Sequence, residues 1–280
     1  MFAGARVFIT GGSSGIGKQI ARDFLRRGAQ VSIAAENAQT LEKARAELSS
    51  SAAPVRAYRC DVADLDQVKS VAAAYVRESG APDILVNNAG YAVYRTVEEM
   101  TSEEIHRLIN VNFVGACLFT REFLPAMIAA RRGHILMVAS IAGRVPMTPC
   151  GVYSASKHGM VAWAETLAAE LDRYQIRVHV VCPARVETAF FAHESFVQRA
   201  PRQEAQWAIP IEKVSGAAIE AIAKGRFLTY VPRKLGPLVW LAHALPVLSR
   251  PMLQRLMRAR VESVYAAKEH SHESIDERVT

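Results

Sequence analysis

TGGSSGIG, the sequence of residues 10–17, follows a strand-like apolar run and leads directly into a helix-like stretch. Gly11 permits a tight turn, Gly15 lets the backbone approach a pyrophosphate, and Gly17 allows the helix to pack closely on the strand. The N-terminus of the following helix offers amide donors and a favourable dipole to phosphate groups. Glycine also serves ordinary turns, but a glycine-rich loop between a first strand and a first helix predicts a dinucleotide-binding site.

Apolar and amphipathic stretches alternate along the rest of the chain. We expect strands at residues 6–10, 30–34, 55–60, 84–87, 134–140, 177–182 and 227–231, and helices at residues 16–27, 40–48, 65–77, 103–130, 153–173 and 212–223. Several strands are almost continuously apolar, which is typical of strands covered by helices on both faces. The alternation predicts the α/β class, with a Rossmann-type, doubly wound parallel sheet in a single domain (residues 1–232) that binds its ligand at the carboxyl ends of the strands.

The composition is that of a folded globular protein. Of the 280 residues, 50% are hydrophobic and 22% are charged, which excludes a disordered chain. The four cysteines form no CxxC pair, so we expect neither a metal site nor a disulfide framework, and a reducing, cytoplasmic setting. The first strand-like run begins at residue 6, too early for a signal peptide to precede it, and no apolar stretch reaches the ~18 residues of a membrane span.

The excess positive charge lies near the C-terminus. The net charge is +7, and the stretch from Arg226 to Arg260 holds seven basic residues and no acidic one. A nucleic-acid binder would carry such charge along a groove or a recognition helix, so no nucleic-acid partner is expected. Residues 233–267 form an apolar and basic extension, expected to be helical, and residues 268–280 are a polar tail that we expect to be mobile.

An apolar run within this extension suggests a binding surface. Residues 235–249 contain Trp240 and are interrupted by Pro237 and Pro246. Apolar residues surrounded by positive charge favour a segment that lies on an anionic membrane surface. The alternatives are a lid over the substrate pocket and a contact between subunits. A peripheral membrane location is therefore a hypothesis beside the cytoplasmic one.

Further polar motifs follow the glycine-rich loop in a fixed order. They are the pair DV at 61–62, NNAG at 87–90, Asn112, Ser140 and YSASK at 153–157. In this combination the chain resembles the short-chain dehydrogenase/reductase family over residues 5–232. The resemblance implies an oxidoreductase that uses NAD or NADP. It also implies a homodimer or homotetramer that assembles through the helices at 103–130 and 153–173.

Tyr153 and Lys157 have the spacing of an acid–base pair. Four residues apart, they share one face of a helix. A phenol has a pKa of about 10, and a neighbouring ammonium lowers that pKa by favouring the phenolate. The family resemblance makes Asn112, Ser140, Tyr153 and Lys157 the catalytic residues. In that assignment Tyr153 exchanges the proton, Ser140 binds the substrate oxygen, Lys157 also holds the nicotinamide ribose, and Asn112 positions a water. Each residue alone has an ordinary structural explanation, and the ordered combination favours the catalytic one.

The resemblance also assigns a set of cofactor-binding residues. They are Gly11, Ser13, Ser14, Gly15, Ile16, Gly17, Glu36, Asp61, Val62, Asn88, Ala89, Gly90, Tyr153, Lys157, Pro183, Val186 and Thr188. The chain departs from the family pattern where Ala184 replaces the usual glycine after Pro183, because alanine disfavours positive φ and the local turn is expected to differ.

The second departure is AAEN at residues 34–37. Glu36 would repel a 2′-phosphate and accept a hydrogen bond from a free ribose hydroxyl. NAD(H) is therefore favoured, with NADP(H) as the alternative. If the Glu36 side chain points into solvent, it has no influence on the choice between NAD(H) and NADP(H).

The expected substrate is a hydrophobic small molecule. The loop at about 185–212 is rich in aromatic residues, and we expect Ser140, Tyr153, Tyr91, Met147, Phe190 and Phe191 to contact the substrate. Alternatively, the aromatic side chains anchor the loop on the core. GGSSGIGK and GYAV are similar to 3-ketodihydrosphingosine reductases, which usually carry Arg where Glu36 stands. Hydroxysteroid and general carbonyl reductases are the enzyme alternatives. A lipid-binding peripheral membrane protein and a nucleotide-sensing scaffold are the non-enzyme alternatives.

Overall fold

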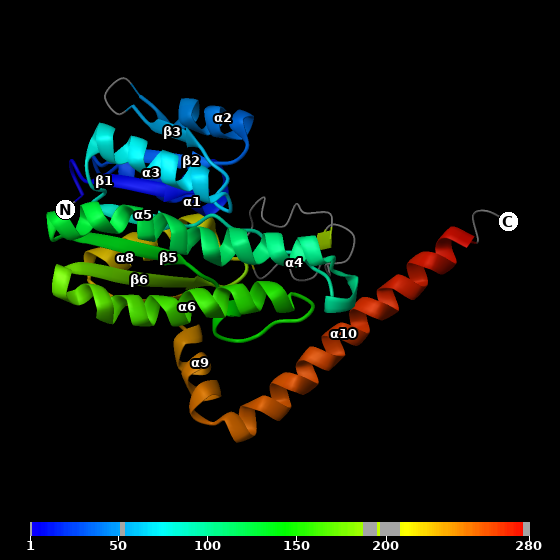
Figure 1. The fold of residues 1–280 in the computed structure, drawn as a ribbon. Coiled ribbons are helices and arrows are strands. Elements are labelled where there is room, and N and C mark those ends of the chain that lie inside the picture. The colour runs from blue at the N-terminus through cyan, green and yellow to red at the C-terminus, as the bar shows by residue number, and fades with distance from the viewer. Residues whose placement is uncertain (1, 51–53, 187–194, 197–207, 277–280) are drawn as a thin grey trace.

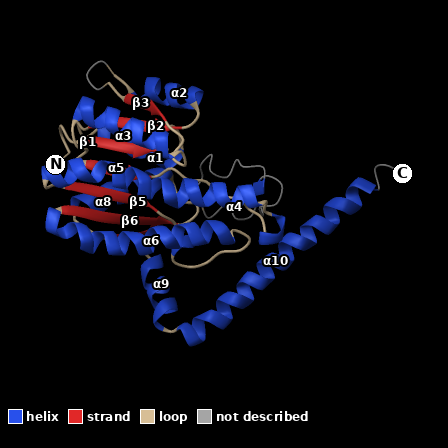
Figure 2. Ribbon diagram, in the orientation of Figure 1, coloured by secondary structure: helices blue, strands red, loops and turns tan. Residues whose placement is uncertain are grey.

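A parallel sheet lies at the centre of the protein (Figure 2). The computed structural model describes residues 2–50, 54–186, 195–196 and 208–276. In these residues the sheet has seven strands in the order β3-β2-β1-β4-β5-β6-β7. The strands are β1 (Arg6–Thr10), β2 (Gln30–Ala35), β3 (Arg56–Arg59), β4 (Ile84–Asn87), β5 (Gly133–Val138), β6 (Ile176–Pro183) and β7 (Leu228–Val231). The predicted doubly wound parallel sheet is confirmed.

Helices cover both faces of the sheet (Figure 1). One face carries α1 (Gly15–Leu25), α2 (Ala38–Leu48) and α8 (Ile211–Ala223). The other face carries α3 (Leu65–Ser79), α5 (Gly115–Ala130) and α6 (Gly151–Leu171), with α4 (Ser102–Ile109) leading into α5. Because helices bury both faces, the strands can be apolar throughout, as their sequences predicted.

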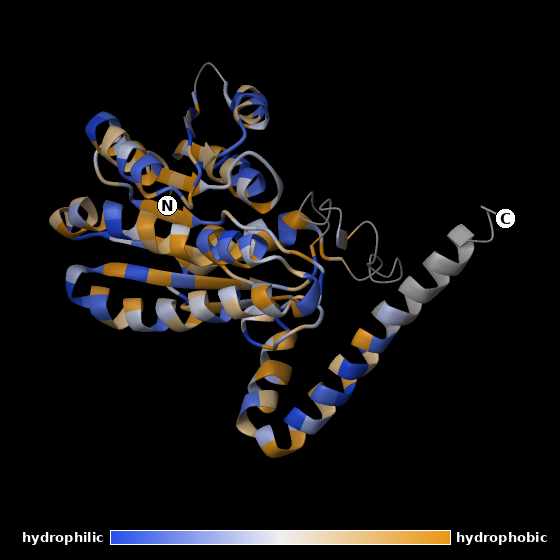
Figure 3. Ribbon diagram, turned by 45° about the vertical axis from the view of Figure 1, so that its right-hand side comes forward, coloured by the Kyte–Doolittle hydropathy of each residue, from blue (hydrophilic) through white to orange (hydrophobic). Residues whose placement is uncertain are grey.

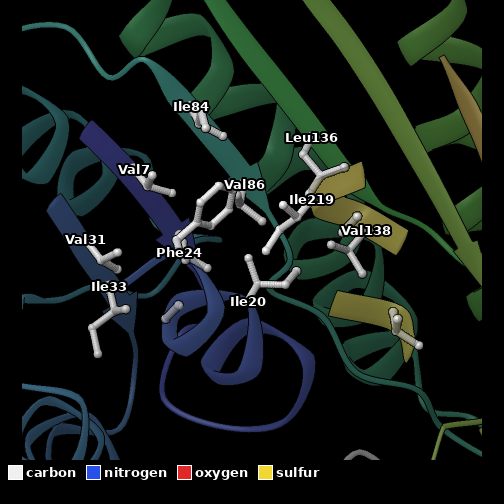
Figure 4. Packing of buried hydrophobic residues seen from close by; sticks show 14 of the residues in the cluster. Val7, Ile20, Phe24, Val31, Ile33, Ile84, Val86, Leu136, Val138 and Ile219 are labelled. Atoms are coloured by element: carbon white, nitrogen blue, oxygen red, sulfur yellow. The ribbon is translucent and has the colours of Figure 1, made fainter. Parts of the chain in front are cut away.

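The core on the α1 face shows how sequence spacing becomes packing (Figure 4). Ile20 and Phe24 are one helical turn apart on α1 and are fully buried. They belong to one cluster with Val7 of β1, Val86 of β4 and Leu136 of β5. Each fully buried large apolar side chain contributes about 1.5–3 kcal/mol to folding. This packing holds the N-terminus of α1 at a fixed place above the sheet.

The order of the strands reverses between β1 and β4. β1 pairs with β2 on one side and with β4 on the other. The chain therefore leaves these two neighbouring strands in opposite directions, which opens a crevice at their carboxyl ends. The glycine-rich loop follows β1 and residues 88–90 follow β4, so both motifs reach that crevice.

The predicted helix at 103–130 is divided by a wider turn. A π-helical segment, Asn110–Val114, lies between α4 and α5. It contains Asn112, whose side chain bonds to the backbone at Tyr91, and such segments are frequent at functional sites. Ser102–Ala130 is also long and apolar enough to cross a membrane, but α5 packs Phe119, Phe123 and Met127 into the core of the α3–α5–α6 face.

The C-terminal extension consists of two helices that diverge from the body (Figure 1). α9 (Leu235–Ala244) is anchored by the buried Val239, and α10 (Pro246–Asp276) runs back past the loops that flank the cofactor side of the sheet. Thr148 Oγ1 donates to the Met257 carbonyl at 3.2 Å, and the hydroxyls of Thr96 and Tyr265 lie 3.2 Å apart. The α10 backbone continues past residue 267, where the sequence analysis ended the extension.

Candidate functional site

The glycine-rich loop forms the phosphate end of the site. Gly11 and Gly15 have φ values of +63° and +53°, a region that favours glycine. A Cβ on Gly17 would lie 2.4 Å from both Gly11 O and Asn88 Nδ2, so only glycine lets α1 approach. Ser14 caps α1 without a side-chain hydrogen bond, and the first turn of α1 carries no acidic residue. The amide donors of this helix end therefore fit the pyrophosphate of a dinucleotide.

Two polar side chains fix this loop against the end of β4. Thr10 Oγ1 accepts hydrogen bonds from the backbone N–H groups of Asn88 and Ala89 at 3.0 and 3.1 Å. In return, Asn88 Nδ2 donates to the carbonyl oxygens of Thr10 and Gly11, both at 3.0 Å. These reciprocal bonds position the glycine-rich loop before any ligand arrives, and a rigid loop lowers the entropy cost of binding.

One cavity of about 570 Å³ joins the glycine-rich loop to the predicted catalytic residues. Its lining includes the predicted Gly11, Ser13, Ser14, Gly15, Ile16, Asn88, Ala89, Gly90, Tyr91, Ser140, Met147, Tyr153, Lys157, Pro183 and Val186. The predicted contacts Thr188, Phe190 and Phe191 lie outside the described residues. Beyond Tyr153 the lining is mostly apolar and includes Ala92, Tyr94, Cys150 and Phe196.

The acid–base pair is placed on α6 as its spacing predicted. Lys157 is 3% exposed, and its Nζ donates to the Val138 carbonyl at 3.0 Å and lies 6.0 Å from the centre of the Tyr153 ring. Burial lowers the pKa of Lys157 from 10.5 to about 8. Burial also raises the pKa of Tyr153, and a hydrogen bond with the Ser140 side chain acts in the opposite direction. The ammonium form of Lys157 would favour the Tyr153 phenolate.

Asn112 lies behind the cavity. Its Oδ1 accepts from the Tyr91 N–H at 2.9 Å, and its Nδ2 donates to the Tyr91 carbonyl at 2.8 Å and to Ser156 Oγ at 3.2 Å. A Cβ on Gly90 would lie 3.0 Å from Asn112 Oδ1 and 3.5 Å from Lys157 Nζ. A side chain at Gly90 would therefore crowd both groups, and Asn112 fixes the backbone at Tyr91, which lines the cavity.

Comparison with known proteins agrees with this geometry. A model of the short chain dehydrogenase family matches residues 5–198. The chain belongs to this family. It is 34% identical over 190 residues to the bovine "Dehydrogenase/reductase SDR family member 7B", covering 66% of this chain and 58% of that protein, which is less than two thirds of its length. It is 31% identical over 255 residues to the mouse "Epidermal retinol dehydrogenase 2", covering 88% of this chain and 79% of that protein.

Solved structures of short chain dehydrogenases share the fold. A Burkholderia phymatum protein in complex with NAD superposes with a TM-score of 0.80 at 27% identity, covering 88% of this chain and 95% of that one. Other matching structures contain NADP or NADPH. Related dehydrogenases thus bind either nicotinamide cofactor in this fold.

Next to the end of β2, the chain contains an ion-pair cluster that the sequence analysis missed. Arg107 of α4 lies between two predicted cofactor residues, with its guanidinium 2.6 Å from Asp61 Oδ2 and 3.1 Å from Glu36 Oε2. Arg59 Nε donates to the backbone carbonyl of Glu36 at 3.3 Å. The third predicted cofactor residue at this place, Val62, packs against α5, since a Cβ on Gly115 would meet its carbonyl oxygen at 2.8 Å. No sequence spacing connects Arg107 to Glu36 or Asp61.

Ala184 follows β6 in the described backbone and has no positive φ. Arg131 and Gln175 are the non-glycine residues with positive φ there, and Ala184 is not among them. Its N–H donates to the Val231 carbonyl at 2.8 Å, and the next residue, Arg185, accepts from Ile209 at 2.8 Å. Ala184 thus avoids the positive φ that alanine disfavours, and a turn that differs from that of the family stays a prediction.

Proposed function

We propose that this chain is an NAD(P)-dependent oxidoreductase that interconverts a hydrophobic ketone and its secondary alcohol. The observation that carries this proposal is the single cavity that connects a phosphate-binding glycine-rich loop to Ser140, Tyr153 and Lys157. The bound nicotinamide supplies or accepts the hydride. A scaffold without activity would not need a buried lysine beside a half-buried tyrosine.

In this proposal each polar side chain has one task during ketone reduction. The Tyr153 hydroxyl donates its proton to the carbonyl oxygen as negative charge develops there. The Ser140 hydroxyl donates a hydrogen bond to the same oxygen. Lys157 stabilises the phenolate that remains and binds the ribose, and Asn112 holds the Tyr91 backbone at the cavity wall. Alcohol oxidation uses the same groups in reverse.

The substrate side of the cavity supports a hydrophobic ligand. Ala92, Tyr94, Cys150 and Phe196 form one buried cluster, against which Tyr153 packs. Retinol, the alcohol in the name of the mouse relative, is a molecule of this kind. Long-chain lipid ketones, 3-ketodihydrosphingosine among them, and steroid ketones belong to the same class.

We favour NAD(H) as the cofactor. The Glu36 side chain follows β2 and is 66% exposed, where it would repel a 2′-phosphate. Arg107 is shared between Glu36 and Asp61, so its charge is already matched by two carboxylates. Arg59, close to the Glu36 backbone, keeps NADP(H) as the alternative.

Reduced-cofactor oxidation with a panel of ketones tests substrate class and cofactor together. We expect a kcat/KM at least about tenfold higher for a long-chain 3-keto lipid or a steroid ketone than for a short β-ketoester, because each buried methylene contributes about 0.8 kcal/mol. NADH should exceed NADPH by roughly tenfold at most, as expected for an exposed charge. If the short ketoester is turned over as well as the long-chain and steroid ketones, the proposal of a hydrophobic substrate is wrong and the function is that of a general carbonyl reductase. A preference for NADPH would contradict the proposed role of Glu36.

We further propose that the extension binds the surface of an anionic membrane. Its apolar surface consists of the exposed residues Leu238, Trp240, Leu241, Leu245, Val247, Leu248, Met252 and Leu256. Figure 3 shows apolar residues along α9 and the first part of α10, interspersed with hydrophilic ones. Lys234, directly before α9, and Arg250, Arg255 and Arg258 of α10 are exposed as well. Exposed apolar and basic side chains together match a headgroup layer of negative charge.

Sedimentation with vesicles that contain phosphatidylserine tests this surface. We expect the double variant Trp240→Ser/Leu248→Ser to bind at least about tenfold more weakly than the wild type, since each side chain loses about 1.5–3 kcal/mol of burial. Leu65→Ser is the control, because Leu65 is a 42% exposed apolar residue on α3. Unchanged vesicle binding, or a change in oligomer size instead, would contradict the membrane proposal and favour a contact between subunits.

A homodimer or homotetramer through α4–α5 and α6 is also part of the proposal. Within Ser102–Ala130 the most apolar window is only 33% buried inside one chain. Phe113 of the π segment and Trp163 of α6 lie edge to face, with ring centres 6.2 Å apart, and neither is fully buried. A second copy of the chain would cover these apolar side chains.

A further inference from the structure

Arg107 bridges two residues of the predicted cofactor site from a helix that lies far from both in the sequence. It belongs to the last turn of α4, whereas Glu36 directly follows β2 and Asp61 lies just after β3. Its guanidinium lies 2.6 Å from Asp61 Oδ2 and 3.1 Å from Glu36 Oε2. The family resemblance assigns both carboxylates to the cofactor but does not include Arg107. A cation from α4 is thus part of the surroundings that the cofactor meets there.

The two ends of this bridge are held unequally. The Asp61 side chain is 22% exposed and the Glu36 side chain is 66% exposed. Asp61 is also fixed by its neighbours, because its Oδ1 accepts from the Ala63 N–H at 2.9 Å and its N–H donates to Gln67 Oε1 at 3.0 Å. The hydrogen bond with Asp61 is the largest cause of the raised pKa of Arg107. Asp61 therefore anchors the guanidinium, and the end at the exposed Glu36 is the one that another acceptor can take over.

The charges of the bridge determine what a 2′-phosphate meets beside Glu36. Two carboxylates and one guanidinium leave a net charge of −1, whereas the carboxylates alone would present −2. A phosphate accepts hydrogen bonds from a guanidinium fork as a carboxylate does, so it competes with Glu36 for Nη2 of Arg107. Arg59 adds a second positive charge, but its Nε bonds to the backbone carbonyl of Glu36 at 3.3 Å.

We propose that Arg107 sets how strongly the site discriminates against NADP(H). With NAD(H), the Arg107–Glu36 pair stays intact, and with NADP(H) the Nη2 end of Arg107 leaves Glu36 and binds the 2′-phosphate. The inference rests on the proposed oxidoreductase function, which brings a nicotinamide dinucleotide to the glycine-rich loop. It assigns the size of the cofactor preference to a residue of α4 that acts together with Glu36.

Two adenosine fragments measure this role without any turnover. Adenosine 5′-monophosphate carries the free ribose hydroxyl, and adenosine 2′,5′-bisphosphate carries the additional phosphate. In calorimetry with the wild type, the two Kd values should differ by less than about tenfold. Arg107→Gln should weaken binding of the bisphosphate by about tenfold or more, whereas the Kd of the monophosphate should stay within about twofold. Fluorescence titrations with NADPH and NADH should show the same selective loss.

Variants at both ends of the bridge separate recognition of the phosphate from a structural effect. Glu36→Gln removes the competing carboxylate and should tighten binding of the bisphosphate by about three- to tenfold. Glu36→Gln/Arg107→Gln should bind it more tightly than Arg107→Gln but more weakly than Glu36→Gln. Arg107→Lys should restore part of the affinity, because it restores the charge without the planar fork. A purely structural role of the Arg107–Asp61 bond would instead weaken both fragments equally.

Two other arginines serve as controls. Arg45 of α2 is 43% exposed and pairs with Glu42, and neither residue is a predicted cofactor contact. Arg45→Gln should therefore leave both Kd values unchanged. Arg59→Gln should weaken binding of the bisphosphate less than Arg107→Gln does, because Arg59 Nε bonds to the Glu36 backbone. An equal loss for both fragments in Arg107→Gln, an unchanged ratio of their Kd values, or a selective loss only in Arg59→Gln would overturn the proposal.

The binding and kinetic results distinguish this inference from the proposed function. If Arg107→Gln loses the bisphosphate selectively while no ketone is reduced by the wild type, the proposed reaction is wrong and the role of Arg107 stands. If the wild type reduces ketones and Arg107→Gln keeps the same ratio of kcat/KM for NADH and NADPH, the reaction stands and Arg107 has no such role. If neither cofactor binds to the wild type, both proposals are wrong.

Discussion

Tyr153→Phe is expected to lower kcat for ketone reduction by about 10²–10⁴-fold, the usual contribution of a positioned general acid. The substitution removes the one hydroxyl that can deliver a proton to the substrate oxygen beside Ser140. The aromatic ring stays, so it still packs against the cluster of Ala92, Tyr94, Cys150 and Phe196. The loss should therefore appear in kcat, while the fold and the affinity for the cofactor remain.

Steady-state kinetics and the change in NADH fluorescence on binding measure the two effects separately. Tyr174→Phe is the matched control, since Tyr174 follows α6 and lies beneath Arg173 at 4.7 Å, outside the cavity lining. If Tyr153→Phe turned over substrate as fast as the wild type, the proposed role of Tyr153 as proton donor would be wrong. A loss of cofactor binding with the same variant would mean that Tyr153 acts mainly in holding the cofactor.

Lys157→Met is expected to lower kcat/KM by about 10²-fold or more, because the same side chain stabilises the phenolate and binds the ribose. The KM for the cofactor should rise with it, unlike in Tyr153→Phe. Burial lowers the pKa of Lys157 from 10.5 to about 8, so the ammonium form is lost as the pH rises through 8. The wild-type kcat/KM should fall above that pH, and the residual activity of Lys157→Met should lack this limb.

The stability of the fold should increase with pH above 8, whereas kcat/KM falls there. Between pH 8 and 10.5 the unfolded chain binds a proton at Lys157 that the folded chain has released. The free energy of unfolding of the wild type should therefore increase with pH in this interval, relative to Lys157→Met. Thermal unfolding at a series of pH values measures the difference, and Lys224→Met is the control because Lys224 is exposed at the C-terminal end of α8, directly after its last residue. A pH-independent difference would show that Lys157 stays charged when buried.

The sequence predicted the sheet and the catalytic end of the site because both depend on local patterns. Strand and helix bounds follow from the apolar periodicity and agree within about two residues at most ends. The Tyr153–Lys157 pair is fixed by the geometry of one helix. In the same way, the place of Gly11 and Gly15 after β1 is enough to put them at the crevice.

The missed features all depend on contacts between distant segments. Arg107 reaches Glu36 and Asp61 because α4 passes the ends of β2 and β3, and no spacing in the sequence encodes that distance. Arg260 lines the cavity because α10 turns back after α9; the sequence analysis named a lid over the substrate pocket as an alternative for the extension, but it did not single out this residue. The π segment at Asn110–Val114 depends on a single bonding pattern between Asn112 and Tyr91, which helical periodicity cannot distinguish from a regular turn.

The central place of β1 in the sheet has a consequence for the order of folding. The glycine-rich loop is synthesised before β4, yet the side chain that holds it, Asn88, directly follows β4. β1 can pair with β4 only after a further 77 residues have been synthesised, as the pair Val7 and Ile84 shows. Parallel pairing between such distant strands is intrinsically slow. The nascent chain therefore exposes an apolar first strand before any cofactor can bind, and the first binding-competent species must already contain both neighbours of β1.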